Sequence, residues 1–216
     1  MSVLISQSYR FIFIHVHKAG GTSVSHALLP YCFPPHESIF TMAARKLGLA
    51  PDFRRFDPHI KARDLRAALP SKKWTEFYKF AVVRNPWEWH VSQYSFIRNR
   101  PDHANHGLVS RMKNFAEYIE WRCGEGKYLQ SDFVCDEAGN LLVDRLLRFD
   151  HLKLEFTELC DKLQIEASLP RMNVTEHEPA GHYYTPETIE MVAEAYRPDI
   201  QLMNFQPPKP DGKAAP

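Results

Sequence analysis

The sequence has few cysteines and no long apolar run, and each absence excludes a class of protein. No C-x-x-C pair occurs, so we predict neither a zinc site nor a redox motif, and we expect free thiols rather than a Cys123–Cys135 disulfide. No segment of 18 apolar residues is present, so we predict no membrane span. The N-terminus lacks a basic region followed by a long apolar one, which argues against a signal peptide.

The charges are almost balanced, with 27 Lys and Arg against 26 Asp and Glu, a formal net charge of +1. The overall field therefore gives no reason to expect a nucleic-acid partner. One stretch is basic: seven basic residues lie between Arg54 and Lys73. It is either a solvated face or a rim for an anionic ligand such as an acidic polysaccharide, and both interpretations stay open.

Apolar runs rich in β-branched and aromatic residues alternate with helical patterns along the chain. The runs and the periodic segments predict strands at 9–16, 77–83 and 141–149 and helices at 22–29, 41–47, 61–69, 86–97, 115–121, 152–163 and from Pro186 onward. This alternation predicts an α/β fold with a mainly parallel central sheet flanked by helices. The length suits a single domain over residues 1–205, and the proline-rich residues 206–216 predict a flexible C-terminal tail.

The first long predicted strand runs directly into a glycine loop. Residues 11–23 read Phe-Ile-Phe-Ile-His-Val-His-Lys-Ala-Gly-Gly-Thr-Ser. A strand, a glycine turn and a helix start together present backbone N–H groups to a phosphate, and Lys18 adds a positive charge. Because Lys18 precedes Gly20 and Gly21, whereas a Walker loop places its lysine after the glycines, we predict a P-loop-like phosphate cradle of another kind. The alternative is a plain glycine turn without a ligand.

A second polar group follows the next predicted strand, which ends at Arg84. Pro86 suits the first turn of the following helix, and Ser92 lies two turns into it. A nucleotide triphosphatase would need an acidic residue at such a strand end to hold Mg²⁺. The paired N–H donors of an arginine suit a phosphate instead, so we predict a second anion site at the edge that also carries Lys18. The alternative is that Arg84 only pairs with a carboxylate.

Both motifs resemble those of the sulfotransferases that use 3′-phosphoadenosine-5′-phosphosulfate (PAPS). Residues 15–23 are similar to the loop that holds the 5′-phosphosulfate, above all in the carbohydrate sulfotransferase branch that includes the heparan 2-O-sulfotransferases. In this chain His17 stands where proline is usual and Ala19 where threonine is usual. Arg84-Asn-Pro with Ser92 is similar to the 3′-phosphate site of that family, and less specific matches extend over 148–156 and 169–189.

The resemblance implies an enzyme that moves a sulfuryl group from PAPS, its cofactor and donor, to an acceptor hydroxyl, above all on a carbohydrate. The implied reaction is an in-line displacement without a metal, and its product is 3′,5′-adenosine bisphosphate (PAP). Lys18 would stabilise charge on the leaving oxygen, and Arg84 and Ser92 would hold the 3′-phosphate. The implied contacts of the 5′-phosphate are Lys18, Ala19, Gly20, Gly21, Thr22 and Ser23.

Two other functions stay open at this point, a small-molecule kinase with a divergent P-loop and a non-catalytic nucleotide-binding module. Animal members of the resembled family are usually Golgi membrane proteins. This chain starts almost at its first strand, so we expect a soluble, cytoplasmic bacterial enzyme or a trimmed form of a longer protein. The oligomeric state is not predicted by the sequence.

His59 and Glu37 are the candidates for the catalytic base. Residues 56–60, Phe-Asp-Pro-His-Ile, resemble the Gly-His-Val stretch that carries the proposed base in the 2-O-sulfotransferase branch, with Pro58 in place of glycine. The ordinary pKa of a histidine, about 6.5, suits proton transfer near neutral pH. Glu37 is the second candidate because other branches use a glutamate after the first helix. Residues 99–140, where the resemblance stops, are expected to bind the acceptor.

Overall fold

The computed structural model describes residues 3–32, 56–170 and 177–211, and the chain divides into two compact units. The sheet unit comprises Met1–Val83 and Asp132–Met172. The helical unit comprises Arg84–Ser131 and Asn173–Pro216. The predicted single domain over residues 1–205 stays a prediction, and the helix expected at 41–47 lies outside the described residues.

The sheet unit is built on four strands in the order β1-β2-β3-β4. The strands are β1 (Leu4–Ser6), β2 (Phe11–Ile14), β3 (Tyr78–Val83) and β4 (Arg145–Arg148). β1 is antiparallel to β2, whereas β2, β3 and β4 run parallel, with Phe13 opposite Phe80 and Phe80 opposite Arg145. All four residues of β2 are buried, so it is the central strand that the apolar run predicts. The predicted α/β class with a mainly parallel sheet is confirmed.

Two details of the sheet differ from the sequence-based prediction. β1 was not predicted, because three residues are too few for a periodic pattern. Its last side chain is polar but buried, and the Ser6 hydroxyl donates a hydrogen bond to the carbonyl of Tyr31 at 2.7 Å. β4 is shorter than the strand expected at 141–149, since the chain turns into a short 3₁₀ helix, η2 (Phe149–His151), directly after Arg148.

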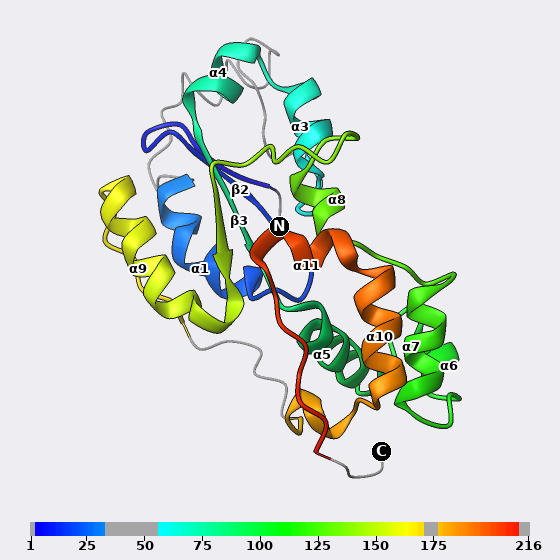
Figure 1. Ribbon diagram of the computed structural model, residues 1–216. Coiled ribbons are helices and arrows are strands. Elements are labelled where there is room, and N and C mark those ends of the chain that lie inside the picture. The colour runs from blue at the N-terminus through cyan, green and yellow to red at the C-terminus, as the bar shows by residue number, and fades with distance from the viewer. Residues whose placement is uncertain (1–2, 33–55, 171–176, 212–216) are drawn as a thin grey trace. The chain divides into compact units, whose positions relative to one another are not determined.

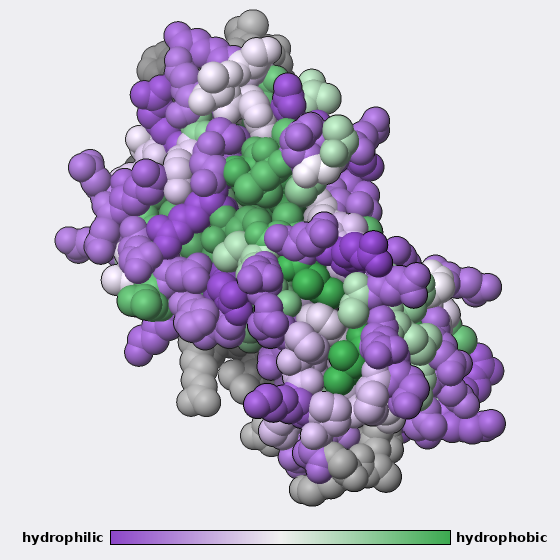
Figure 2. Space-filling view, viewed as in Figure 1, coloured by the Kyte–Doolittle hydropathy of each residue, from purple (hydrophilic) through white to green (hydrophobic). Residues whose placement is uncertain are grey.

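Helices cover the sheet, and two of them, α1 and α9, lie on the same side of it (Figure 1). The helices in the described part of this unit are α1 (Gly21–Cys32), α3 (Ala62–Ala68), α4 (Ser71–Glu76) and α9 (Leu152–Leu163). α8 (Ser131–Val134) begins at the last residue of the helical unit before the chain returns to the sheet unit. α9 has the predicted bounds and buries its predicted apolar positions. Its outer surface is mainly hydrophilic (Figure 2), as expected of an amphipathic helix that packs with one face.

The helical unit consists of α5 (Pro86–Arg98), α6 (His106–Val109), α7 (Phe115–Cys123), η3 (Ala180–His182), α10 (Pro186–Ala195) and α11 (Arg197–Met203). Its core is aromatic and includes the buried guanidinium of Arg122, which lies 4.9 Å from the ring of Trp89. α10 starts where the sequence predicts, because Thr185 caps it by accepting a hydrogen bond from the backbone N–H of Thr188.

The described part of the predicted tail makes polar contacts within the helical unit. The side-chain amide of Asn85 donates to the carbonyl of Gln206 at 2.8 Å. The backbone N–H of Asp211 donates to the carbonyl of Gly181 at 3.1 Å, and its carboxylate lies 3.1 Å from Nδ1 of His182. Residues 206–211 therefore follow a defined path without regular structure, while the flexibility of the whole tail stays a prediction.

Two expectations from the sequence, the absence of a membrane span and free thiols, can be compared with the described residues. Within the described ranges, no helix is long and apolar enough to cross a membrane. All four cysteines fall within those ranges and carry thiols, with no disulfide between them.

Candidate functional site

The predicted phosphate loop lies in the sheet unit, between the end of β2 and the start of α1. β2 and β3 are parallel, so their carboxyl ends share one edge of the sheet, where ligands of α/β proteins bind. α1 begins directly after the loop, since the N–H groups of Ser23 and Val24 donate to the carbonyl of Gly20 at 3.1 and 3.4 Å. The positive end of the α1 dipole therefore lies at the loop.

Two residues of the loop have left-handed backbone conformations, Lys18 with φ of +57° and Gly20 with φ of +83°. Glycine adopts this conformation freely, but a residue with a side chain pays roughly 1 kcal/mol or more for it. Strain of this kind collects at functional sites. The conformation of Lys18 is thus a reason, independent of its charge, to assign this loop a function.

Both glycines of the loop are also required by packing, which the sequence did not reveal. A Cβ atom on Gly20 would lie 2.9 Å from the ring of Phe149 and 3.0 Å from the side chain of Leu152. A Cβ on Gly21 would lie 2.1 Å from Cδ2 of His15. The loop is therefore pressed against the start of α9 on one side and against the His15 imidazole on the other.

His59 lies beside this loop, in contact with two of its residues. Nδ1 of His59 is 3.0 Å from the carbonyl oxygen of His15. The rings of His59 and His17 are stacked, with centroids 3.4 Å apart and planes 19° apart, and the ring of His15 lies 4.4 Å from that of His59. A carbonyl only accepts hydrogen bonds, so Nδ1 of His59 carries the hydrogen. In the neutral ring, Nε2 is then the nitrogen with a lone pair.

The two loop histidines are neutral at neutral pH. Burial lowers the pKa of His15 to about 3, and the imidazoles of His59 and His17 act in the same direction. Burial and the His59 imidazole lower the pKa of His17 to about 4, while the carboxylate of Asp57 acts in the opposite direction. Lys18, the residue after His17, therefore supplies the full positive charge of residues 15–23 at neutral pH.

Arg84 belongs to the helical unit and directly follows the last residue of β3. Its backbone is held by Gln130, whose side-chain oxygen accepts from the Arg84 N–H at 2.9 Å and whose side-chain nitrogen donates to the Arg84 carbonyl at 2.7 Å. The carboxylate of Asp199 in turn accepts from the N–H groups of Gln130 and Ser131, both at 2.8 Å. Sequence reasoning missed Gln130 and Asp199, because isolated polar residues carry no pattern that marks them as buried.

The side chain of Arg84 is buried and lies 3.6 Å from the carboxylate of Glu88, one turn along α5. Burial lowers the pKa of Arg84, and Glu88 opposes that effect. Ser92, also buried, is one turn beyond Glu88 on the same row of α5, whereas Arg84 precedes the N-cap residue Asn85. The structure thus contains the carboxylate partner that the alternative interpretation of Arg84 requires, and the assignment of Arg84 and Ser92 to a 3′-phosphate stays a prediction.

Ala19 is buried, and Thr22 and Ser23 are half-buried in the first turn of α1. Glu37, the second candidate base, lies outside the described residues. In the part of the chain that the structure describes, no group of three His, Cys, Asp or Glu side chains has the arrangement of a metal site.

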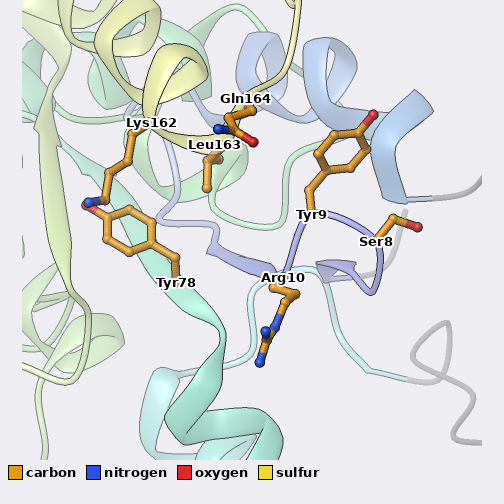
Figure 3. A pocket seen from close by; sticks show the side chains of 7 residues that line it. All are labelled: Ser8, Tyr9, Arg10, Tyr78, Lys162, Leu163 and Gln164. Atoms are coloured by element: carbon orange, nitrogen blue, oxygen red, sulfur yellow. The ribbon is translucent and has the colours of Figure 1, made fainter.

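An open pocket lies in the same unit at the opposite end of the strands, where β2 and β3 begin (Figure 3). Lys162 reaches across the ring of Tyr78, with Nζ 4.8 Å from the ring centroid. Arg10 extends away from Lys162 and pairs with Glu76 at 2.5 Å. Because this pocket is at the amino ends of the strands, it is separate from the predicted phosphate loop.

Comparisons with known proteins bear on the family and the fold of this chain. Residues 1–206 match the sequence model of the sulfotransferase family. A search of curated proteins finds no match. Among solved structures, the chain is similar to mouse sulfotransferase SULT7A1 complexed with PAP, with a TM-score of 0.55 and 14% identity over 93% of this chain and 87% of that one; at this identity the likeness concerns the fold. Because the family model covers nearly its whole length, this chain belongs to the sulfotransferase family.

Proposed function

We propose that this chain transfers a sulfuryl group from PAPS to a hydroxyl group of a carbohydrate. Membership of the sulfotransferase family supports sulfuryl transfer as the general activity. The PAP in the similar mouse structure supports PAPS as the donor. The likeness of residues 15–23 to the carbohydrate branch, together with the basic stretch from Arg54 to Lys73, supports an acidic carbohydrate as the acceptor.

The loop between β2 and α1 is the proposed site of the 5′-phosphosulfate. Left-handed residues in a short loop turn successive N–H groups toward one point, which creates a concave anion site, and Lys18 and Gly20 have that conformation. The hydroxyl groups of Thr22 and Ser23 add donors at the start of α1. The ammonium group of Lys18 would stabilise the negative charge that develops on the oxygen bridging phosphorus and sulfur.

His59 is the proposed general base. The acceptor oxygen would form a bond to sulfur while its proton passes to Nε2 of His59, and the bond from sulfur to the bridging oxygen would break with both electrons leaving on PAP. Support comes from the hydrogen bond between Nδ1 of His59 and the carbonyl of His15, which leaves Nε2 as the acceptor nitrogen.

Arg84 and Ser92 are the proposed contacts of the 3′-phosphate. An arginine can hold a phosphate through two parallel N–H donors. The Glu88 carboxylate is half-exposed and 3.6 Å from the guanidinium, so it has room to turn to solvent when a phosphate takes its place beside Arg84.

The test is a transfer assay with labelled PAPS over a panel of acceptors containing acidic polysaccharides, short saccharides and phenols. We expect label in the saccharides and no effect of added EDTA. Transfer to phenols alone would contradict the carbohydrate acceptor. Phosphoryl transfer from ATP that requires Mg²⁺ would contradict the proposed reaction itself.

A further inference from the structure

We infer that His17 is a positioning residue for the proposed base, because its ring stacks on His59 and holds the imidazole with Nε2 available to the acceptor. This inference rests on the proposed function, since it concerns the base of that reaction. The likeness to the sulfotransferases does not supply it, because His17 stands where those sequences usually have proline.

Besides the neighbouring His15 ring, His59 has contacts that each restrict a different motion. The backbone N–H of His59 donates to the carboxylate of Asp57 at 2.7 Å, which fixes the turn that carries the side chain. The hydrogen bond from Nδ1 to the His15 carbonyl fixes the ring flip and the tautomer. Rotation of the ring out of its plane is opposed by the stack with His17, at 3.4 Å between centroids.

The stack also suits the charge that forms during the reaction. When Nε2 takes the acceptor proton, His59 becomes a cation facing the ring of His17. A neutral aromatic ring attracts a cation through its face, whereas a second imidazolium would repel it. His17 is neutral at neutral pH, since burial and the His59 imidazole lower its pKa to about 4. The bond from Nδ1 to the His15 carbonyl becomes charge-assisted in the same step, which strengthens it.

The surroundings of His17 keep its ring in place. The ring of Phe133 meets it edge-on with centroids 6.0 Å apart, and Lys61 lies over the ring of Phe133 with Nζ 5.6 Å from the centroid. Lys61 in turn lies 3.5 Å from the carboxylate of Asp132. Among the described residues, the ionisable groups near the stack include His15, Asp57 and Lys18 on the chain beside it, and Lys61 and Asp132 beyond Phe133.

Two substitutions separate a stacking role from a purely local structural one. His17→Phe keeps a flat ring of similar width but removes the nitrogens, whereas His17→Leu removes the flat face. We expect His17→Phe to keep kcat within about threefold and His17→Leu to lower kcat about tenfold or more, part of the range of general-base catalysis. The Kd for PAP should change less than about twofold in both variants. The reason is that the His17 ring stacks on His59, which is not a predicted contact of the cofactor.

Nuclear magnetic resonance of the His59 ring nitrogens gives a readout that does not depend on turnover. We expect hydrogen on Nδ1 in the wild type and in His17→Phe. In His17→Leu the unstacked ring can rotate and break its hydrogen bond to the His15 carbonyl, so we expect a mixture of tautomers. Wild-type kcat and an unchanged tautomer in His17→Leu would overturn the inference. Equal losses in the two variants, or a loss of PAP affinity as large as the loss of kcat, would overturn it as well.

A His59→Ala variant distinguishes failure of this inference from failure of the proposed function. Normal turnover in His59→Ala would remove His59 as the base, and with it the positioning role of His17. If His59→Ala loses turnover while His17→Leu does not, the base assignment stands and only the role of His17 is wrong. A circular dichroism spectrum of each variant shows whether the chain is still folded.

Discussion

Lys18 combines a positive charge with a backbone conformation that lysine adopts at a cost. Lys18→Ala and Lys18→Gly both remove the charge, but only the glycine also relieves the left-handed strain. We expect both variants to lose kcat to a larger extent than affinity for PAP, because the ammonium group acts on charge that develops in the transition state. In urea unfolding, Lys18→Gly should be more stable than Lys18→Ala by about 1 kcal/mol.

Equal losses of kcat and of PAP affinity would make Lys18 a binding residue only. A Lys18→Ala protein as stable as Lys18→Gly would mean that residue 18 does not have a left-handed conformation in solution.

The loop histidines predict a dependence of stability on pH. The pKa values of His15 and His17 are about 3 and about 4 in the folded chain, below the ordinary value of 6.5. Between these limits the unfolded chain binds more protons than the folded one, so the free energy of unfolding falls as pH drops below about 6.5. We expect a lower urea midpoint at about pH 5 than at about pH 7, and a smaller drop in His17→Phe. An equal drop in wild type and variant would contradict the burial of His17 in neutral form.

At the scale of elements, the junction between β2 and α1 is held by contact between a glycine and a ring. A Cβ on Gly21 would lie 2.1 Å from the His15 ring, so Gly21→Ala must displace that ring or the start of α1. We expect Gly21→Ala to lower the free energy of unfolding by about 1–3 kcal/mol, as overpacking does. Gly107→Ala in α6 is the control, since no atom lies within 4 Å of the added Cβ. Gly107→Ala should leave the free energy of unfolding unchanged or raise it by up to about 1 kcal/mol, since alanine favours a helix. Equal stability of the two variants would contradict the packing described for the loop.

Local patterns made several elements predictable. The apolar spacing of Leu152, Phe156, Leu159 and Leu163 predicted α9, and Thr185 before Pro186 predicted the start of α10, because both signals act within one or two helical turns. β1 could not be predicted, since it is defined by its pairing with β2 rather than by a pattern of its own. The hydrogen bonds from the Arg84 N–H to Gln130 and from the Gln130 N–H to Asp199 were also not predicted, because they join residues that are far apart in sequence.

At the scale of the whole molecule, the sulfotransferase family followed from two short motifs and the fold class from the alternation of strands and helices, and both predictions are confirmed. The sequence placed His59 near the loop only through resemblance, whereas the structure brings it into contact with His15 and His17. The roles of His59, Lys18, Arg84 and Ser92 in the reaction stay proposals. The binding of the acceptor by residues 99–140 stays a prediction, and these residues contain no motif that predicts which acceptor it is.

The use of PAPS is tested most directly by calorimetric titration of the wild-type chain with PAP and with AMP, which lacks the 3′-phosphate. A charge-assisted contact between Arg84 and that phosphate is worth roughly 1.5–3 kcal/mol, so PAP should bind about ten- to a hundredfold more tightly than AMP. Arg84→Gln should abolish most of this difference while leaving AMP affinity unchanged. Equal affinities of the wild-type chain for PAP and AMP would contradict the account.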